Sequence, residues 1–378
     1  MASKNFLPNH LRLPETFSGK LDWGESDRLI QKYLSENYNE SERSWSLKKS
    51  AYYALRPLLP RHIQIFLRRI YSRVQSRALF PHWPIEEILV SHMESEMKRL
   101  AQVCGQSKIP FVGYWPEGYN WSLVLTHDVE SSVGVANIKN VIEIEKTYGF
   151  RSSWNFVPER YPFDRNILDW LVGEGFEVGV HGLKHDGKLF SSHQVFQSRL
   201  KRIHNYMSNW GAEGFRSPAT HRRYEWMPEL QFLYDSSFPD TDIYEPQPGG
   251  CCWCFPYFIQ QLLELPITLP QDHTLLEILG NQDFSNWYKK IEWLRAKNGM
   301  ALLILHPDYV TDRGRLKLYE QFLIKMSADS SMWNPLPKQL ASWWKDRDAS
   351  RITVSDSQYE IAGPIKDMGG RICFYECT

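Results

Sequence analysis

The feature of this sequence that most constrains its fold is an alternation of short apolar runs with stretches of helical period, beginning near Trp121. The apolar runs predict buried β-strands at 122–126, 151–157, 176–180, 214–216, 262–265 and 300–305. Helices are predicted at 137–148, 164–174, 194–210, 285–297, 315–326 and 337–345. Strands that alternate with helices form a parallel sheet, either open or closed into a barrel. The sequence therefore predicts an α/β fold.

The chain divides into three segments that differ in composition and in hydrophobic pattern. Residues 1–115 are rich in Arg, Ser and Pro and predict a helical N-terminal extension, whose role the sequence leaves open. Residues 116–350 carry the alternating pattern and form the main domain. Residues 351–378 contain RITVSDSQYEI and RICFYE, which predict a C-terminal β-hairpin or small sheet.

Composition excludes several classes of protein. Lys+Arg and Asp+Glu number 44 each, so no bulk positive charge favours nucleic-acid binding. The longest clean apolar run, 300–305, is far shorter than the ~20 residues of a membrane span. The first residues, MASKNFLPNHLRLPE, show no signal-peptide pattern. We therefore expect a cytoplasmic protein.

Polar side chains interrupt the ends of two predicted strands in a way that favours a metal site. The run SLVLTHDVE ends in Asp128 and Glu130, which lie two apart and so face the same side of extended backbone. The run FEVGVHGLKHDG delivers His181 and, four residues later, His185. Two histidines and one carboxylate form the ligand set of an open catalytic zinc site.

Three further segments carry candidate site residues. Arg216 follows the short strand in GFRSP, where an arginine can hold a catalytic carboxylate ionised. The long segment YDSSFPDTDIYEPQPGGCCWCFPY predicts a binding loop. In MALLILHPDYV a buried strand delivers His306, a candidate acid catalyst if a metal site lies nearby.

The order LTHDVE, VHGLKHD, GFRSP, YDSSFPDTD and LLILHPDY resembles the five successive motifs of the polysaccharide deacetylase (NodB-homology) family. The resemblance covers roughly residues 121–310 and does not extend to residues 1–115. It implies a distorted (β/α)7-type barrel. It also implies a metal-dependent hydrolase that removes N- or O-acetyl groups from sugars, with N-acetyl as the expected bond.

The resemblance assigns roles position by position. Asp128 matches the catalytic base and His306 the general acid, while Arg216 matches the arginine that orients the base. His181 and His185 match the two metal-binding histidines. One divalent ion is implied, with zinc the expected metal.

The first motif departs from the usual family pattern T-F-D-D-G. Val129 stands where the metal-binding Asp is usual, so Glu130 is the expected third ligand, with His127 as an alternative. If neither binds, only two histidines remain and metal affinity is weak.

Aromatic residues make up 14% of the chain and favour either a large core or a sugar-binding groove. Candidate substrate contacts are Trp226, Asp240, Trp253 and Tyr257, with an acetylated sugar or glycan precursor as partner. Two alternatives stay open. One is a catalytically silent relative that binds glycan or metal, and the other is a hydrolase of a C–N bond in a small metabolite.

The segment 54–80 is basic and partly amphipathic, with Arg61, Arg68, Arg69, Arg73 and Arg77. One interpretation is a helix that packs on the main domain with solvated arginines. The other is a peripheral contact with the inner face of a membrane.

Overall fold

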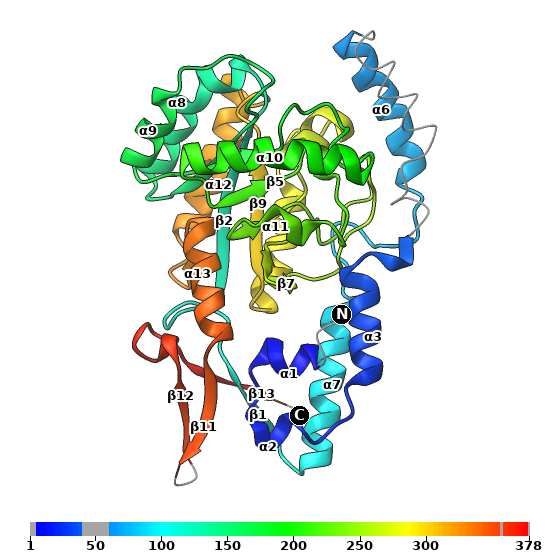
Figure 1. Cartoon of the computed structure of the whole chain (residues 1–378), viewed down its shortest axis with the longest axis vertical. Coiled ribbons are helices and arrows are strands. Elements are labelled where there is room, and N and C mark those ends of the chain that lie inside the picture. Colours follow the sequence, from blue (N-terminus) through cyan, green and yellow to red (C-terminus); the bar gives the residue numbers. More distant parts are fainter. Residues whose placement is uncertain (1–4, 40–59, 356–357, 377–378) are drawn as a thin grey trace.

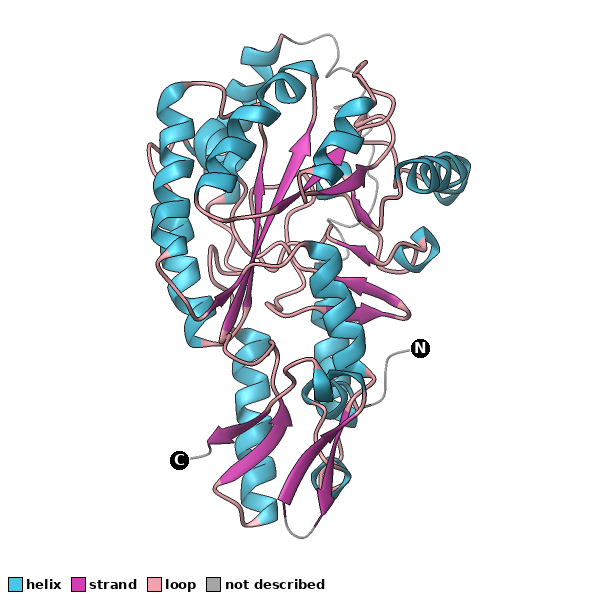
Figure 2. Cartoon of the chain, turned by 90° about the vertical axis from the view of Figure 1, so that its left-hand side faces the viewer, coloured by secondary structure: helices cyan, strands magenta, loops and turns pink. Residues whose placement is uncertain are grey.

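The computed structural model describes residues 5–39, 60–355 and 358–376, and Figure 1 shows two parts stacked along the long axis. The upper part holds the large sheet and the helices around it. The lower part holds the first helices of the chain together with both ends of the described sequence (Figures 1 and 2).

The large sheet contains nine strands, and its parallel ladder runs β9-β2-β3-β4-β5-β6-β8. The short strand β10 pairs in parallel with the start of β2, and β7 pairs antiparallel with β8. The bounds are β2 Trp121–Val129, β3 Ser152–Phe156, β4 Glu177–His181, β5 Gly214–Arg216, β6 Tyr234–Asp235, β7 Tyr257–Ile259, β8 Leu262–Glu264, β9 Met300–Leu305 and β10 Met332–Trp333.

Residues after β8 bridge the gap to β9. The Leu269 N–H donates to the Leu302 carbonyl over 3.0 Å, and the Leu302 N–H donates to the Thr268 hydroxyl oxygen over 2.7 Å. Backbone and side-chain bonds thus replace a regular ladder at this point, so the sheet curls into a distorted (β/α)7-type barrel. The predicted fold class is confirmed.

The apolar runs form strands because the barrel buries both of their faces. Every residue of β2 and of β9 is buried, as expected of strands in a parallel sheet covered by helices. Six of the seven strands in the ladder from β9 to β8 coincide with predicted runs. β6 has only two residues, Tyr234–Asp235, and so offers no periodicity to detect.

Helices of the main domain follow the predicted segments closely. Ser131 and Ser192 cap the N-termini of α8 and α10, and each side-chain oxygen accepts a hydrogen bond from a backbone N–H of the first turn. The bounds are α8 Ser132–Thr147, α9 Asn166–Gly173, α10 His193–Trp210, α11 Ser285–Ala296, α12 Arg313–Ser327 and α13 Pro337–Asp348. Short helical turns are η3 Pro218–Thr220, η4 Met227–Leu230, the π-helical η5 His273–Leu279 and η6 Pro364–Asp367.

The N-terminal segment packs against the main domain through helices and one strand. Its elements are α1 Phe6–Leu11, α2 Glu15–Ser18, α3 Gly24–Leu34, η1 Asn37–Asn39, α6 Arg61–Gln75, α7 Ile88–Cys104 and β1 Lys108–Val112. Glu36, just after α3, accepts a hydrogen bond over 2.8 Å from Arg222, which follows η3. Both side chains are buried, so the contact fastens the segment beside the barrel.

The end of the chain joins the N-terminal segment. Strand β13 (Ile372–Glu376) pairs antiparallel with β1, and β11 (Arg351–Ser355) forms a hairpin with β12 (Gln358–Ala362). Only the hairpin is local in sequence. The pairing of β13 with β1 joins residues more than 250 positions apart, which a local pattern does not reveal.

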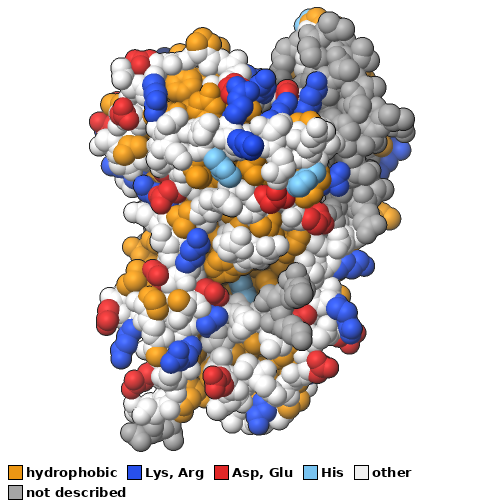
Figure 3. Space-filling view, in the orientation of Figure 1, with side chains coloured by type: hydrophobic (Ala, Val, Ile, Leu, Met, Phe, Trp, Pro, Cys, Tyr) orange, Lys and Arg blue, Asp and Glu red, His pale blue; other side chains and the backbone are white. Residues whose placement is uncertain are grey.

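The surface carries mixed charge. On the face drawn in Figure 3, Lys and Arg side chains are interspersed with Asp and Glu, as the equal totals of the two types predict. Among the described helices, none combines the length and the apolar character that crossing a bilayer requires.

Candidate metal centre and active site

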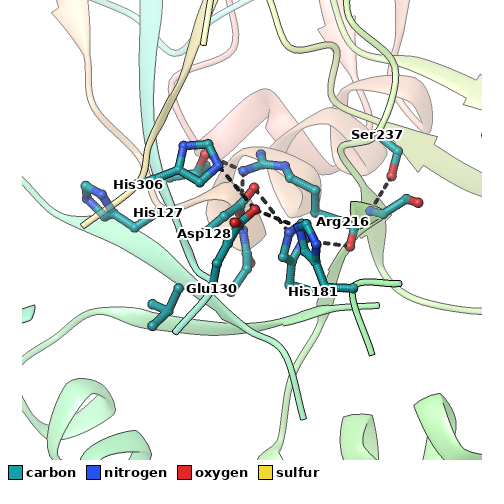
Figure 4. A network of polar contacts seen from close by, with 12 residues as sticks. His127, Asp128, Glu130, His181, Arg216, Ser237 and His306 are labelled. Atoms are coloured by element: carbon teal, nitrogen blue, oxygen red, sulfur yellow. Dashed lines mark hydrogen bonds and ion pairs between the residues drawn. The ribbon is translucent and has the colours of Figure 1, made fainter. Parts of the chain in front are cut away.

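The polar side chains of β2 point to two opposite sides of the strand. The Thr126 hydroxyl and the Asp128 carboxylate face the barrel interior, where both accept hydrogen bonds from Arg216. His127 lies between them on the opposite side and contacts α8. Because alternate residues of a strand face the same side, Glu130 continues the inward row one residue beyond β2 (Figure 4).

Glu130, His181 and His185 form a group in which one ligand atom from each residue lies within 4.8 Å of the others. His185 Nε2 is 2.6 Å from Glu130 Oε1. The Glu130 carboxylate also accepts a hydrogen bond from the Tyr309 hydroxyl over 3.3 Å. The structure thus brings together the three residues predicted to hold a metal.

The histidines of this group fit a metal ion. His181 Nδ1 lies 3.1 Å from the Arg216 carbonyl, an acceptor, so Nδ1 carries the hydrogen and Nε2 keeps its lone pair. His181 Nε2 and His185 Nδ1 are buried and have no hydrogen-bond partner within the described part of the chain, while His185 Nε2 contacts only the Glu130 carboxylate described above. Burial lowers the pKa of His181 to about 4, which keeps its imidazole neutral, as a ligand must be.

Asp128 lies beside this group as an ionised carboxylate. Its Oδ1 accepts hydrogen bonds from Arg216 Nη1 at 3.0 Å and from Asn155 Nδ2 at 2.9 Å. Burial raises the pKa of Asp128, but the positive charge of Arg216 and smaller contributions, including that of His181, outweigh it and lower the pKa to about 2. Arg216 is itself fixed, because its Nε donates to the Ser236 carbonyl over 2.8 Å.

His306 approaches from the end of β9. Its Nδ1 is 2.6 Å from Asp272 Oδ1, and its backbone N–H donates to Asp272 Oδ2 over 2.8 Å. Burial lowers the pKa of His306, but the negative charge of Asp272 outweighs this and raises it to about 10. The imidazole is therefore held protonated with Nε2 free to act, 3.8 Å from Glu130.

A cavity of about 90 Å³ lies among these side chains. Asp128, Glu130, His181, His185 and His306 line it on the barrel side. The opposite side is formed by the loop after β5, by η5, and by Gln64, Ile65 and Arg68 of α6. Because a cavity needs only about 10–15 Å³ to hold one water molecule, this cavity has room for a small group such as acetyl beside the candidate ligands.

The backbone around the cavity is strained. His185, Ala219 and Thr220 have φ values of 52°, 54° and 49°, a left-handed region that residues with a Cβ rarely adopt. Such strain gathers at functional sites, where the surrounding structure enforces it. Here it turns the His185 imidazole towards Glu130 and shapes the loop after β5.

His127 lies outside the site. Its Nε2 is 2.7 Å from Glu145 Oε1 on α8, and its Nδ1 is 3.1 Å from the Leu305 carbonyl. Both ring nitrogens are thus engaged by oxygen atoms of the protein, and neither is directed to Glu130, His181 and His185. Figure 4 shows His127 pointing away from the other labelled side chains. The structure therefore favours Glu130 over His127 as the third ligand.

Whether His127 is a structural residue or a metal ligand can be tested by measuring the unfolding free energy and the metal content of His127 variants. His127→Leu leaves the buried Glu145 carboxylate with the hydroxyl groups of Ser152 and Tyr319 but without its histidine partner, and His127→Gln keeps one N–H for it. We expect the leucine variant to lose about 3–5 kcal/mol of unfolding free energy and the glutamine variant to lose less. Urea unfolding measures this loss, and mass spectrometry measures the metal content of each folded variant. Metal loss at unchanged stability would make His127 a ligand after all.

The four expected substrate contacts do not line the cavity. Trp253 and Tyr257 are fully buried, and Trp253 packs against His10 and Phe255 in the core. Asp240 is buried and lies 2.5 Å from the Lys290 ammonium. Trp226 stacks on Phe190 instead of facing the cavity. These aromatic residues lie near the site loops in sequence, but apolar burial takes them into the core.

Several residues of the site escaped sequence reasoning. Asn155 is aligned with Asp128 in the β2–β3 register and stands out as a polar residue in the strand SSWNF, a signal that could have identified it. Asp272 lies 34 residues before its partner His306, and no local pattern connects them. Gln64, Ile65 and Arg68 lie in the N-terminal segment, whose role the sequence left open.

No protein-family model matches the chain, and no curated protein matches it. Solved structures do. A protein from Mycobacterium smegmatis assigned as a polysaccharide deacetylase is 17% identical, with a TM-score of 0.49, over 65% of this chain and 96% of that one. A protein from Pseudomonas aeruginosa with the same assignment is 16% identical, with a TM-score of 0.49, over 62% of this chain and 93% of that one.

A third similar structure is Puue Allantoinase, which is 15% identical, with a TM-score of 0.48, over 62% of this chain and 93% of that one. The chain is thus similar to solved polysaccharide deacetylases, the family that its motif order resembles.

Proposed function

We propose that the protein is a metal-dependent hydrolase that removes acetyl groups, most simply N-acetyl, from a carbohydrate or glycan precursor. The observation that carries this proposal is the arrangement around one cavity. A group of three side chains that could hold a metal ion lies beside a carboxylate held ionised and a histidine held protonated. Hydrolysis of an amide or ester needs a base for water and an acid for the leaving group, and the two side chains supply them.

Asp128 is the proposed base. With a pKa of about 2 it is ionised across the neutral range, and Oδ2 is the oxygen left free by Arg216 and Asn155. A water molecule between Asp128 and His181 would pass its proton to this oxygen as it attacks the acetyl carbonyl. Arg216 and Asn155 are positioning residues, because they hold the carboxylate without reaching the cavity themselves.

Glu130, His181 and His185 would hold the metal, and their nitrogen and oxygen donors suit zinc. When bound, a divalent ion supplies Lewis-acid polarisation of a carbonyl and lowers the pKa of water. The neutral His181 tautomer set by the Arg216 carbonyl and the short approach of His185 to Glu130 are the features of the chain that prepare this position.

His306 is the proposed acid. Nε2 carries the proton, because Nδ1 is engaged by Asp272. From its place in the cavity lining, Nε2 can donate to the nitrogen or oxygen that leaves the acetyl group. Asp272 acts through His306, holding its ring and keeping it protonated.

The direct test is acetate release. Purified protein loaded with zinc is incubated with N-acetyl and O-acetyl sugars, both free and linked to nucleotides or lipids, and acetate is measured enzymatically. The proposal expects release from at least one of them and none from metal-stripped protein. Metal-loaded protein that releases acetate from no member of this series, while retaining metal, would favour the silent binder.

The role of His306 predicts a dependence on the leaving group. A sugar amine leaves only when protonated, whereas 4-nitrophenolate leaves without a proton. We expect His306→Gln to lower kcat by about 10²–10³ on an acetylated sugar and by no more than a few fold on 4-nitrophenyl acetate. Parallel kinetics on both substrates measure this. Equal losses would give His306 a purely structural role.

The cover that Gln64, Ile65 and Arg68 of α6 place over the cavity favours a second candidate, hydrolysis of a C–N bond in a small metabolite. A small substrate would fit between α6 and the candidate ligands, whereas a glycan would have to extend past the helix. If the substrate is small, free acetamides and ureides should be turned over better than the same group on a sugar. Comparing kcat/KM across these two sets separates the candidates.

A further inference from the structure

Helix α6 is amphipathic in the reverse of the usual sense. A surface helix normally turns its apolar face to the core and its polar face to water. In α6 the side chains that pack on the protein are mainly polar, with Ser72 and Gln75 buried. Arg68 donates to the Tyr244 carbonyl, and Gln75 Nε2 donates to the Glu245 carbonyl over 3.3 Å.

The opposite face of α6 is an apolar stripe open to solvent. Its members recur at the spacing of one helical face, three and four residues apart. Their exposed fractions range from 37% to 61%, for Ile63, Phe66, Leu67, Ile70, Tyr71 and Val74. From Ile63 to Val74 the stripe runs for about 17 Å along the helix. A continuous exposed apolar surface of this length marks an interaction site.

Charge beside the stripe indicates what covers it. Arg73 and Arg77 are exposed, and Arg69 joins them on the same flank while its Nε donates to the Glu277 carbonyl over 2.8 Å. From residue 61 to residue 85 the sequence contains no Asp or Glu. A second copy of the helix would bring arginines against arginines without a carboxylate to pair them. An anionic surface is the complementary partner.

We propose that α6 docks on an anionic lipid surface, inserting the apolar stripe between headgroups and placing Arg73 and Arg77 against phosphates. Apolar side chains flanked by arginines suit the interfacial layer, because long arginine side chains reach the phosphates while their stems stay in the apolar zone. The arginines alone suggested this contact from sequence, and the outward apolar face supplies the physical reason for it.

Docking would also orient the catalytic cavity. Gln64, Ile65 and Arg68 on the inner side of α6 line that cavity, so its mouth would lie next to the membrane (α6, Figure 1). The corollary that the acetylated substrate is carried by a lipid rests on the proposed function. Docking itself does not, since binding to vesicles needs no turnover.

The test is co-sedimentation of the full chain with vesicles of phosphatidylcholine alone or of phosphatidylcholine mixed with phosphatidylglycerol. We expect wild type to bind the anionic vesicles, less at high salt, and the neutral vesicles weakly. The triple variant Phe66→Ser/Ile70→Ser/Val74→Ser should lose binding to both. Arg73→Gln/Arg77→Gln should weaken binding to anionic vesicles by about 25-fold, since one arginine near such a surface contributes about fivefold.

A matched control removes exposed apolar residues elsewhere. Val133→Ser/Val172→Ser/Ile324→Ser changes side chains of similar exposure, 46–57%, on α8, α9 and α12 and should bind like wild type. Wild type that ignores both vesicles, or a stripe variant that binds like wild type, overturns the proposal. So does a dimer in ultracentrifugation that the stripe variant abolishes, because the face would then belong to a second copy.

The two proposals fail separately. Asp128→Asn should bind vesicles like wild type although it is expected to be inactive. If no substrate released acetate, the proposed membrane docking could still be supported by vesicle binding. If the protein did not bind vesicles, the proposed deacetylase activity would be unaffected.

Discussion

Asp128→Asn is expected to lose about three orders of magnitude in kcat for acetate release while it keeps its metal. The asparagine side chain is nearly the same size but cannot take a proton from water, and a general base contributes about 10²–10⁴ to a rate. Asp128 donates no ligand atom to the group of Glu130, His181 and His185, so metal content should stay unchanged. Steady-state kinetics and mass spectrometry on the same preparation measure the loss of activity and the retention of metal.

The substitution also leaves a charge unpaired. Arg216 is 1% exposed, and Asp128 is its carboxylate partner at 3.0 Å, so Asp128→Asn should destabilise the fold by a few kcal/mol. Thermal unfolding must therefore show that the variant is folded at the assay temperature. Asp164→Asn makes the same change on an exposed carboxylate and should keep wild-type activity. Substantial activity in folded Asp128→Asn would remove Asp128 from the role of base.

His181→Ala and His185→Ala are each expected to lose both the metal and all measurable activity. In the proposed site the two imidazoles would supply two of the three ligand atoms, and a site left with one histidine and one carboxylate would bind zinc weakly at neutral pH. Protein is incubated with zinc, dialysed and analysed by mass spectrometry, with about one ion per chain expected for wild type and a small fraction of that for the variants.

His193→Ala is the matched control for these variants. His193 is a partly exposed histidine at the start of α10, where it contacts Glu229 outside the cavity, so its removal should change neither metal content nor activity. Glu130→Gln keeps the shape of the third ligand and removes its charge, and we expect an intermediate metal affinity. Equal metal contents in wild type and in His181→Ala/His185→Ala would place the ion elsewhere.

Most of the main domain could be predicted from local pattern. Apolar runs such as 300–305 form strands because both faces of a parallel sheet are buried. Segments with a period of 3.6 residues, such as 194–210, form helices because only one face of each helix is buried against the sheet. Strand β6 was not predicted because its two residues are too few to show a hydrophobic period. Neither the pairing of β13 with β1 nor the bridge between residues 268–269 and β9 follows from any local signal.

The sequence also predicted which residue types meet at the site, because the carboxyl ends of parallel strands lie at one edge of the sheet. Asp128, Glu130, His181, Arg216 and His306 each follow or end such a strand. It did not predict which residues line the cavity, and none of the four expected substrate contacts does so. The residues proposed for that role are aromatic or acidic, and whether such a residue lines a cavity or fills the core depends on packing partners far away in the chain.

Strand period and strand-end chemistry were thus determined by the sequence itself, since both depend on neighbours a few residues away. The tertiary structure alone decided three matters. It turned His127 to Glu145 and Glu130 to the histidines, it supplied Asp272 to His306 across 34 residues, and it laid α6 polar side inward over the cavity. Each depends on which surfaces meet when the chain closes, and that information is spread over distant segments.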